Sequence, residues 1–468
     1  MRKLSIFGVL YFFSIQLFFG QTKTAKLDSL FNILYQSKKF NGNVLIAEKG
    51  EIIYKNSFGL ANELTKEKLN LNSVFELASV SKQFTAMGIV KLKEKGKLNY
   101  EDKIGKYLPE LNFYDISIKN LLQHTSGLPD YMQLLDSLLI DATWDNKTKI
   151  ATNKDIIAIF SKHKSKLLFE PNTKWEYSNT GYALLASVIE KITKKTYANY
   201  LQEEIFKPLK MNTTFVYTRR LYPKKIKNYA YGYVYSDSLK RNVLPDEVPQ
   251  LDLMVYCLDG IVGDGTVNST TLDLLKWDRA LYNSNFLSEN SKKEVFSSGI
   301  LNDSTATEYG FGWGLENSKK FGKITKHSGS WPGYRTYIER HLDNDKTIIF
   351  LENNDNENTV NPIKEIQEIL YNITPLKFIN LEIETLKKYA GIYLNDKNEE
   401  KEFIIKNEKL NIKINPQVQL ELQPITETKF KVKGFDPEVI IDFVLDNDKV
   451  IKYLATQEGR IKSGLKKN

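Results

Sequence analysis

The chain has 468 residues, of which 41% are hydrophobic and 26% charged. These values are ordinary for a soluble folded protein and exclude disordered and fibrous classes, and the length predicts a main domain plus a smaller one. The formal net charge is +9, but basic residues are scattered among acidic ones instead of forming a stripe. The excess charge therefore indicates a solvated surface suited to an anionic envelope, and no nucleic-acid partner is expected.

The counts of cysteine and histidine bear on redox and metal chemistry. The single cysteine, Cys257, excludes an internal disulfide, and its apolar neighbours indicate a small core residue. The four histidines lie far apart, without the spacing of metal ligands. We therefore expect neither a metal nor an organic cofactor.

The first residues have the three-part form of a secretory signal peptide. Arg2 and Lys3 precede an uncharged run from Leu4 to Phe19, and Gly20 is a small residue at which a peptidase can cut. An uncleaved anchor is the alternative, but the run is short against the ~20 residues of a spanning helix. We expect residues 1–20 to be removed, the chain to be periplasmic or extracellular, and no stable membrane span to remain.

Apolar periodicity predicts strands near both ends of the first 370 residues and helices between them. Residues 43–58 alternate around a Lys-Gly-Glu turn, as in a β-hairpin. A helix is expected from about Ser79 to Lys95, and further helical patterns are Ile118–Gln123, Asp155–Lys162, Thr180–Ile192, Tyr197–Ile205 and Thr271–Leu281. Short strand-like segments then follow at Gly310–Gly314, Lys323–His327, Thr336–His341 and Thr347–Leu351, with one more helix at Val360–Tyr371.

This order predicts a mixed α/β (α+β) domain in which one sheet is closed by both terminal regions and helices pack beside it. After Pro375 the residues alternate with period two and show little helix, which predicts a small β-barrel. The expected strands are Tyr389–Tyr393, Glu402–Ile405, Leu410–Ile414, Gln419–Leu422, Phe430–Val432 and Val439–Leu445. We therefore divide the chain into residues 1–20, 21–375 and 376–468.

One Ser-x-x-Lys pattern is placed for nucleophilic chemistry. Residues i and i+3 share a helix face, so the Lys82 ammonium can lie beside the Ser79 hydroxyl, and a helix start supplies free N–H groups. The pattern also occurs at Ser161, inside a predicted helix, and at Ser463, in a basic tail. Context therefore selects Ser79.

Two further elements follow in a fixed order. Tyr177-Ser178-Asn179 begins 98 residues after Ser79, and His327-Ser328-Gly329 lies at the end of a predicted strand. Ser-x-x-Lys, Tyr-x-Asn and a basic-hydroxyl-Gly triplet in this order resemble the penicillin-recognising serine enzymes. The resemblance is strongest to class C β-lactamases and their D-aminopeptidase and esterase relatives, and spans about residues 27–372. Similar flanking segments are Phe75–Phe84, Leu121–Pro129, Phe206–Met211 and Tyr309–Trp313.

The resemblance implies a β-lactamase/DD-peptidase fold, an antiparallel sheet flanked by helices with a helical subdomain, followed by a lipocalin-like β module. It implies that Ser79 is acylated and that Lys82 and Tyr177 together act as the base. Asn179 is then expected to orient Lys82 and the substrate amide, and His327 to lie in the substrate site. The oxyanion hole is expected from the backbone N–H groups of Ser79 and Ser330.

The triplet departs from the β-lactamase pattern, because His327 stands where those enzymes carry lysine. Histidine is mostly neutral above pH ~6.5, so a permanent cation for a substrate carboxylate is lost. This favours an exported serine hydrolase for ester or amide substrates, including D-amino peptides, that contacts the cell wall. The alternatives are a β-lactamase or D,D-carboxypeptidase, and a non-catalytic penicillin-binding-like envelope protein.

Several other residues are of types found in functional sites, but a structural role is expected for most of them. We expect His124 to shape a turn below the site. The glycine-rich segment Gly260–Gly265 lacks the following Lys-Ser/Thr of a phosphate loop and is expected to be a backbone device before a helix. For Trp331 and Tyr334, lining the substrate cleft and simple packing remain equally open.

Overall fold

The structure, a computed structural model, describes residues 23–134 and 150–467, apart from the single positions 284, 357, 375, 416, 436 and 458. The predicted signal peptide, residues 1–20, and the predicted boundary residue Pro375 lie outside the described residues. Within the described part of the chain, no helix combines the length and the apolar character needed to cross a membrane. The chain divides into two compact units, the first ending at Ile366 and the second beginning at Gln367.

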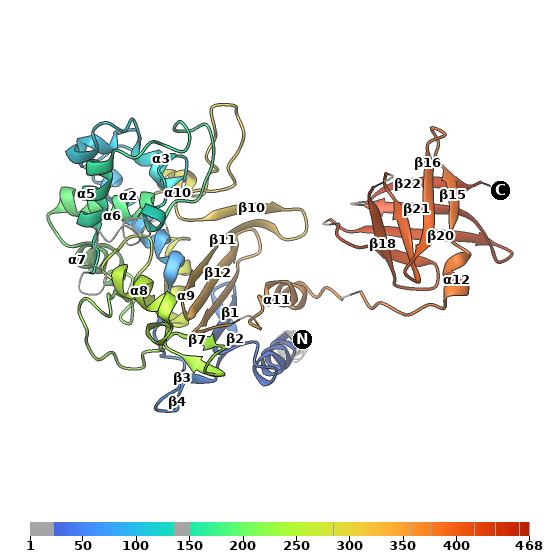
Figure 1. The fold of residues 1–468 in the computed structure, drawn as a ribbon, viewed down its shortest axis with the longest axis horizontal. Coiled ribbons are helices and arrows are strands. Elements are labelled where there is room, and N and C mark those ends of the chain that lie inside the picture. Colours follow the sequence, from blue (N-terminus) through green and yellow to red (C-terminus); the bar gives the residue numbers. More distant parts are fainter. Residues whose placement is uncertain are drawn as a thin grey trace, which may run out of the picture. The chain divides into compact units, whose positions relative to one another are not determined.

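An antiparallel six-stranded sheet organises the first unit, in the order β10-β11-β12-β13-β1-β2 (Figure 1). The strands come from both ends of the unit, as the sequence predicts: β1 Gly42–Glu48, β2 Glu51–Phe58, β10 Gly314–Ser318, β11 Gly322–Trp331, β12 Tyr334–His341 and β13 Lys346–Glu352. Strand β1 pairs with β13 through Gly42↔Glu352 to Glu48↔Lys346. All residues from Gly42 to Ala47 are buried, so both faces of this strand are covered.

Helices cover the sheet and form the region beside it (Figure 1). Helix α9 packs against β13 and β1, and the helical residues 23–36 place Phe31 against Tyr54 and Phe58 of β2. The α-helices are α2 Lys82–Glu94, α3 Ile118–Leu122, α5 Asn153–His163, α6 Asn179–Thr193, α7 Tyr197–Leu201, α8 Pro249–Cys257, α9 Thr271–Ala280, α10 Glu289–Val295 and α11 Ile363–Leu370. Shorter turns are η1 Ala78–Ser81, η2 Ile104–Lys106, η3 Pro109–Leu111, the π-helical η4 Gln202–Phe206 and η5 Pro245–Glu247.

Small strands join loops of the first unit: β3 Leu60–Asn62, β4 Glu67–Lys68, β5 Phe75–Glu76, β6 Phe215–Val216, β7 Tyr233–Ser236, β8 Arg241–Val243, β9 Val267–Ser269 and β14 Asn354–Asp355. In particular, β9 pairs with both β5 and β6. Because β5 leads directly into η1, this pairing fixes the backbone that precedes the predicted nucleophile.

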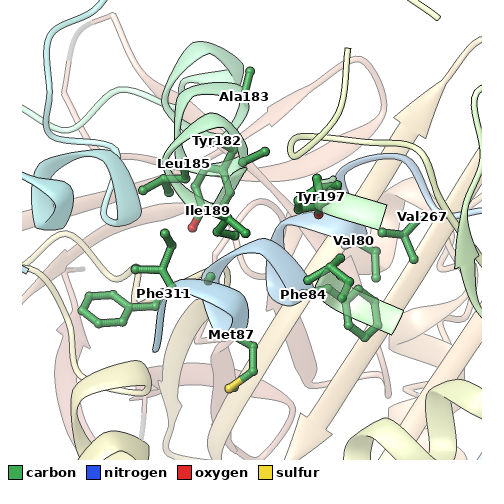
Figure 2. Close-up of a cluster of buried hydrophobic side chains, with 14 of the residues drawn as sticks. Val80, Phe84, Met87, Tyr182, Ala183, Leu185, Ile189, Tyr197, Val267 and Phe311 are labelled. Atoms are coloured by element: carbon green, nitrogen blue, oxygen red, sulfur yellow. The ribbon is translucent and has the colours of Figure 1, made fainter. Parts of the chain in front are cut away.

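Helices α2 and α6 share a packed apolar core (Figure 2). Val80, Phe84 and Met87 project from η1 and α2, and Tyr182 and Ile189 project from α6; all are fully or almost fully buried. Removing such a side chain typically costs about 2–5 kcal/mol, because the surrounding structure collapses only partly into the cavity. This packing holds the start of α2 and the start of α6 in fixed relation.

The expected strand at Gly310–Gly314 is wrong for most of its length, because only Gly314 lies in β10. Gly312 has φ 75°, and a Cβ there would lie 2.9 Å from the Lys82 carbonyl oxygen. The glycines therefore permit a tight turn against α2 and do not build an extended strand.

The second unit is a closed barrel of strands β15 to β22. Its elements are α12 Ile383–Lys387, β15 Gly391–Leu394, β16 Glu400–Lys406, β17 Lys409–Lys413, β18 Gln419–Pro424, β19 Lys429–Val432, β20 Val439–Asp446, β21 Lys449–Gln457 and β22 Arg460–Lys466. Buried aromatic side chains fill the interior, namely Tyr389, Tyr393, Phe403, Phe430, Phe443 and Tyr453. The expected β-barrel is thus confirmed, with a packed core as in small barrels.

The final two strands were not expected from the sequence. The placement of Ser463 in a basic tail was wrong, because β22 pairs Ser463 with Leu454 of β21. In β22 only Gly464 is buried, so the apolar alternation that signals a strand is almost absent. Barrel closure onto β15 and pairing with β21 hold this strand in place.

Candidate active site

Ser79 lies in the 3₁₀ turn η1, immediately before α2. In a 3₁₀ helix residues i and i+3 eclipse one another, so the side chains of Ser79 and Lys82 are brought together. Ala78 has φ 47°, a left-handed conformation that costs energy for a residue with a Cβ. The chain thus turns sharply at the residue immediately before the serine that presents its hydroxyl.

The amine of Lys82 is buried and makes three polar contacts. Its Nζ lies 3.1 Å from Ser79 Oγ, 2.8 Å from Asn179 Oδ1 and 2.9 Å from the backbone oxygen of Asp264. The amide and backbone carbonyl oxygens can only accept, so two N–H bonds are committed to them. A neutral amine in this position directs its lone pair at Ser79, whereas an ammonium donates its third hydrogen there. The geometry therefore suits removal of the serine proton by Lys82.

Tyr177 approaches Lys82 through its ring. Lys82 Nζ lies 4.8 Å from the centre of the phenol ring, within the range of a cation–π contact. Among the described residues the Tyr177 hydroxyl has no hydrogen-bond partner, and the residue is 36% exposed. Tyr177 is thus brought beside Lys82 as a partly exposed side chain that solvent can reach.

Asn179 begins helix α6, and Ser178 caps that helix by accepting from the Gly181 N–H. The side-chain amide of Asn179 donates through Nδ2 to Asp130 Oδ2 at 3.1 Å. A carboxylate oxygen accepts, so this contact turns Oδ1 of Asn179 toward Lys82. The expected role of Asn179 in orienting Lys82 therefore has a geometric basis.

His124 packs beneath Tyr177, with ring centres 4.4 Å apart. Its Nδ1 accepts from the backbone N–H of Ser178, so the ring is neutral with its hydrogen on Nε2. Burial and the nearby Lys82 charge hold the pKa of His124 well below its ordinary value of 6.5. His124 thus supports the tyrosine loop through packing and a backbone hydrogen bond.

His327 lies on β11 and is also buried. Its Nδ1 is 2.6 Å from the Ser328 carbonyl oxygen, which can only accept, so Nδ1 carries the hydrogen and Nε2 accepts from the Tyr309 hydroxyl at 3.0 Å. Burial, then the Lys82 charge, lowers the pKa of His327 to about 3. At neutral pH the side chain is therefore uncharged and supplies no cation to a substrate carboxylate.

Strand β11 lies directly against the nucleophile turn. A Cβ on Gly329 would come within 2.3 Å of the Leu77 carbonyl oxygen and 3.1 Å of the Ser79 nitrogen, so this position requires glycine. Thr336 on the neighbouring strand β12 donates to the same Leu77 oxygen at 2.6 Å. The strand is thereby held where the backbone after Gly329 can face Ser79, as the expected oxyanion hole requires.

A cavity of about 100 Å³ opens beside the nucleophile. Ser79, Asn179 and Ser330 line it together with Trp331. Tyr334 instead is buried and donates to the Ala230 carbonyl oxygen at 2.8 Å. Of the two aromatic residues left open by the sequence, Trp331 lines the cleft and Tyr334 packs behind it. The other lining residues are Glu76, Ala78, Tyr131, Met132, Leu258, Asp259, Ile261, Asp264, Gly265 and Thr266.

The structural interpretations of two other segments are confirmed. Gly263 has φ 109°, and a Cβ there would lie 2.4 Å from the Tyr182 carbonyl oxygen, so the glycine-rich segment is a backbone device. Cys257 is buried at the end of α8. The glycine-rich segment also brings Asp264 to the site. Its glycine pattern alone did not identify this residue as part of the site.

Glu76 is a further acidic group that was not singled out from the sequence. It lines the cavity from β5, and burial, reinforced by the nearby Asp259 carboxylate, raises its pKa to about 7. Between pH 4.5 and 7 the folded chain therefore keeps a proton that the unfolded chain releases. The free energy of unfolding falls as pH rises through this window.

The variant Glu76→Gln should remove this pH-dependent loss. In thermal denaturation from pH 5 to pH 8, the Tm of the first unit of the variant should rise relative to that of the unaltered chain as pH increases. The corresponding gain in the free energy of unfolding is at most about 3 kcal/mol. Glu289→Gln, whose side chain is 70% exposed, is the matched control and should show no such trend. A difference in Tm that stays constant with pH would show that Glu76 is ionised throughout.

The fold and the contacts of Ser79, Lys82, Tyr177 and Asn179 define the class of serine enzymes that share the β-lactamase fold. The sequence profile of the family described as Beta-lactamase matches residues 31–372, and the chain belongs to this family. Penicillin-binding protein 4* of Bacillus subtilis (strain 168) is 43% identical over 449 residues, covering 94% of this chain and 98% of that protein.

Solved structures share the fold at lower identity. The octameric penicillin-binding protein homologue from Pyrococcus abyssi superposes with a TM-score of 0.63 at 24% identity, covering 94% of this chain and 99% of that chain. D-amino acid amidase from Ochrobactrum anthropi SV3, complexed with L-phenylalanine amide, gives a TM-score of 0.57 at 23% identity, covering 76% and 97% of the two chains. The expected fold class is therefore confirmed over both units.

Proposed function

We propose that this protein is an exported serine hydrolase that forms an acyl-enzyme at Ser79 with esters and amides, including peptides of D-amino acids. The observation that carries the proposal is the 3.1 Å contact between Lys82 Nζ and Ser79 Oγ, with two other contacts of the amine made to obligate acceptors. A serine hydroxyl becomes nucleophilic only when a base takes its proton, and this arrangement places a base in reach.

The reaction then proceeds in two transfers. Lys82 takes the Ser79 proton as Oγ attacks the substrate carbonyl carbon, and the oxyanion is stabilised by the Ser79 and Ser330 backbone N–H groups. The proton passes to the departing alcohol or amine as the C–O or C–N bond breaks, which leaves the acyl group on Oγ. Tyr177, which lies beside Lys82 and is partly exposed, assists a water molecule that attacks the acyl-enzyme ester, and Ser79 regains its proton as the acid leaves.

Three observations support the substrate class and the location. Neutral His327 provides no cation for the carboxylate of a β-lactam or of a peptide C-terminus. A 43%-identical relative is a penicillin-binding protein, and a D-amino acid amidase shares the fold. The signal-like residues 1–20 and the net positive charge support export toward an anionic cell wall. N-terminal sequencing of the exported chain would test the cleavage.

Intact mass spectrometry tests the proposal with a panel of esters, D-amino acid amides, D-peptides and β-lactams. We expect transient acyl adducts and product release with the esters and D-amino acid substrates. Adducts that persist with β-lactams alone, without turnover of any other compound, would favour a penicillin-binding envelope protein. No adduct with any member of the panel would refute acylation at this site.

A β-lactamase or D,D-carboxypeptidase is the second candidate, favoured by the family and by the similarity to a penicillin-binding protein. If the uncharged His327 limits β-lactam turnover, His327→Lys should raise kcat/KM for a chromogenic cephalosporin by about 10-fold or more, because a charge-assisted hydrogen bond contributes ~1.5–3 kcal/mol. His327→Gln, which is neutral, is the control and should give no rise. Efficient cephalosporin turnover by the unaltered chain would instead favour this second candidate.

A further inference from the structure

The two obligate acceptors of Lys82 are each held by one residue of a dipeptide that follows the segment Leu121–Pro129. Asp130 contacts Asn179, and Tyr131 contacts Asp264. Asp130 and Tyr131 lie one hydrogen bond farther from the nucleophile than the residues assigned above. Their effect on the amine is therefore indirect and acts through the direction of its hydrogen bonds.

The first contact fixes the side-chain amide of Asn179. Asp130 Oδ2 accepts from Asn179 Nδ2 at 3.1 Å, and Asn179 Oδ1 then accepts from Lys82 Nζ at 2.8 Å. If the amide rotated by 180°, Nδ2 would face Lys82 Nζ, donor against donor, and Oδ1 would face the carboxylate, acceptor against acceptor. The carboxylate of Asp130 thus makes one amide orientation favourable and the other repulsive.

The second contact fixes the loop that carries the other acceptor. Burial, followed by the Asp264 charge, holds the pKa of Tyr131 well above its ordinary value, so its hydroxyl stays protonated and donates to Asp264 Oδ2 at 2.7 Å. The backbone oxygen of the same Asp264 accepts from Lys82 at 2.9 Å. A displaced Asp264 would therefore move an acceptor of the amine.

The dipeptide is itself anchored to α6. The Tyr131 N–H donates to Thr180 Oγ1 at 2.8 Å, and the Thr180 hydroxyl donates to the Pro129 carbonyl oxygen at 2.8 Å. Asp130 Oδ1 also accepts from the Met132 N–H at 2.8 Å. Since Thr180 follows Asn179 directly in α6, the loop and the amide it orients move as one body.

We propose that Asp130 and Tyr131 are positioning residues that direct the lone pair of Lys82 at Ser79. The inference rests on the proposed function, since it assigns the pair to the acylation step. Loss of the Asp130 contact frees the Asn179 amide to rotate, and a misdirected base lowers the rate, while every side chain that lines the cavity is retained. Misplacement of this kind costs up to about 10²-fold in rate.

Asp130 also places a negative charge near the amine. Two variants separate the effect of this charge from the effect of the hydrogen bond to Asn179. Asp130→Asn keeps an acceptor oxygen for Asn179 but removes the charge, whereas Asp130→Ala removes both. Both variants therefore lose the charge, and only Asp130→Ala also loses the acceptor that fixes the Asn179 amide. The other titratable or charged groups that face Lys82 are Ser79, His124, Tyr177, Tyr182, Asp264 and His327.

The test measures the rate at which a fluorophosphonate probe labels the full chain, together with kcat and KM for a small ester across pH. Asp130→Ala should label about 10²-fold more slowly with KM changed by less than about threefold. Asp130→Asn should stay within about fivefold of the unaltered chain, and Tyr131→Phe should label about 10-fold more slowly. Asp237→Asn, an exposed acid-to-amide change, is the control and should have no effect.

A Lys82→Met background shows whether the effect passes through the amine. There, Asp130→Ala should cause no further loss of labelling. Full labelling of Asp130→Ala, an Asp130→Asn variant as slow as Asp130→Ala, or an equal loss in the Lys82→Met background would each overturn the inference while leaving the proposed function standing. An unaltered chain that the probe does not label would overturn both.

Discussion

Replacing Ser79 by alanine should lower kcat/KM for a small ester by at least about 10⁴-fold and abolish acyl adducts. Removal of the nucleophile of a serine hydrolase leaves only binding and oxyanion stabilisation, and costs of about 10⁶-fold are typical. The alanine fits the same 3₁₀ turn, so the fold should remain. Steady-state ester hydrolysis, measured with the circular dichroism spectrum and Tm of the variant, checks this result.

The two other Ser-x-x-Lys serines provide matched controls for Ser79→Ala. Ser161 lies in α5 and Ser463 in β22, and we expect alanine at either position to leave ester hydrolysis unchanged. If Ser79→Ala retained the activity of the unaltered chain, another residue would be the nucleophile. The assignment of the site would then be wrong.

Replacing Lys82 by methionine should lower the acylation rate by about 10³-fold or more, because the base is lost while side-chain volume is nearly kept. The same change leaves the partly buried Asn179 and Asp264 oxygens without their donor, at up to about 1–3 kcal/mol each. The Tm of the first unit should therefore fall as well. Stopped-flow measurement of the acylation burst separates the rate effect from stability.

Lys82→Arg separates the charge of this residue from its basicity. A guanidinium stays protonated and cannot take the serine proton, so the rate should remain low although a cation is present. Acylation by Lys82→Arg or Lys82→Met at the unaltered rate would instead assign the base to Tyr177 or to water.

The fold could be predicted from the sequence wherever burial imposes a clear period. The hairpin of β1 and β2, the helix α9 and the strands β12 and β13 carry such patterns. The exceptions have physical causes: the glycines near Gly312 serve a turn against α2, and β22 is held by barrel closure without an apolar face. Sequence patterns report burial, and they miss segments that are fixed by close approach or by pairing alone.

The residues of the site could be predicted in part for a similar reason. The motifs around Ser79, Tyr177 and His327 are local, and the structure brings them together, with Lys82 beside Ser79 and the Tyr177 ring, and the Tyr177 ring near His327. Asp130 and Tyr131 directly follow the family-like segment Leu121–Pro129, so the sequence shows that they lie next to a motif. Their contacts with α6 and with Asp264 join residues far apart in the chain and could not be predicted from it. The neutral state of His327 likewise depends on burial and on the nearby Lys82 charge, which the His-Ser-Gly triplet alone does not convey.

Peptide mapping of the unaltered chain after brief exposure to a fluorophosphonate probe tests the central claim most directly. We expect one probe adduct per chain, on the peptide that contains Ser79. An adduct on a different peptide, or none after prolonged exposure of the folded protein, would contradict it.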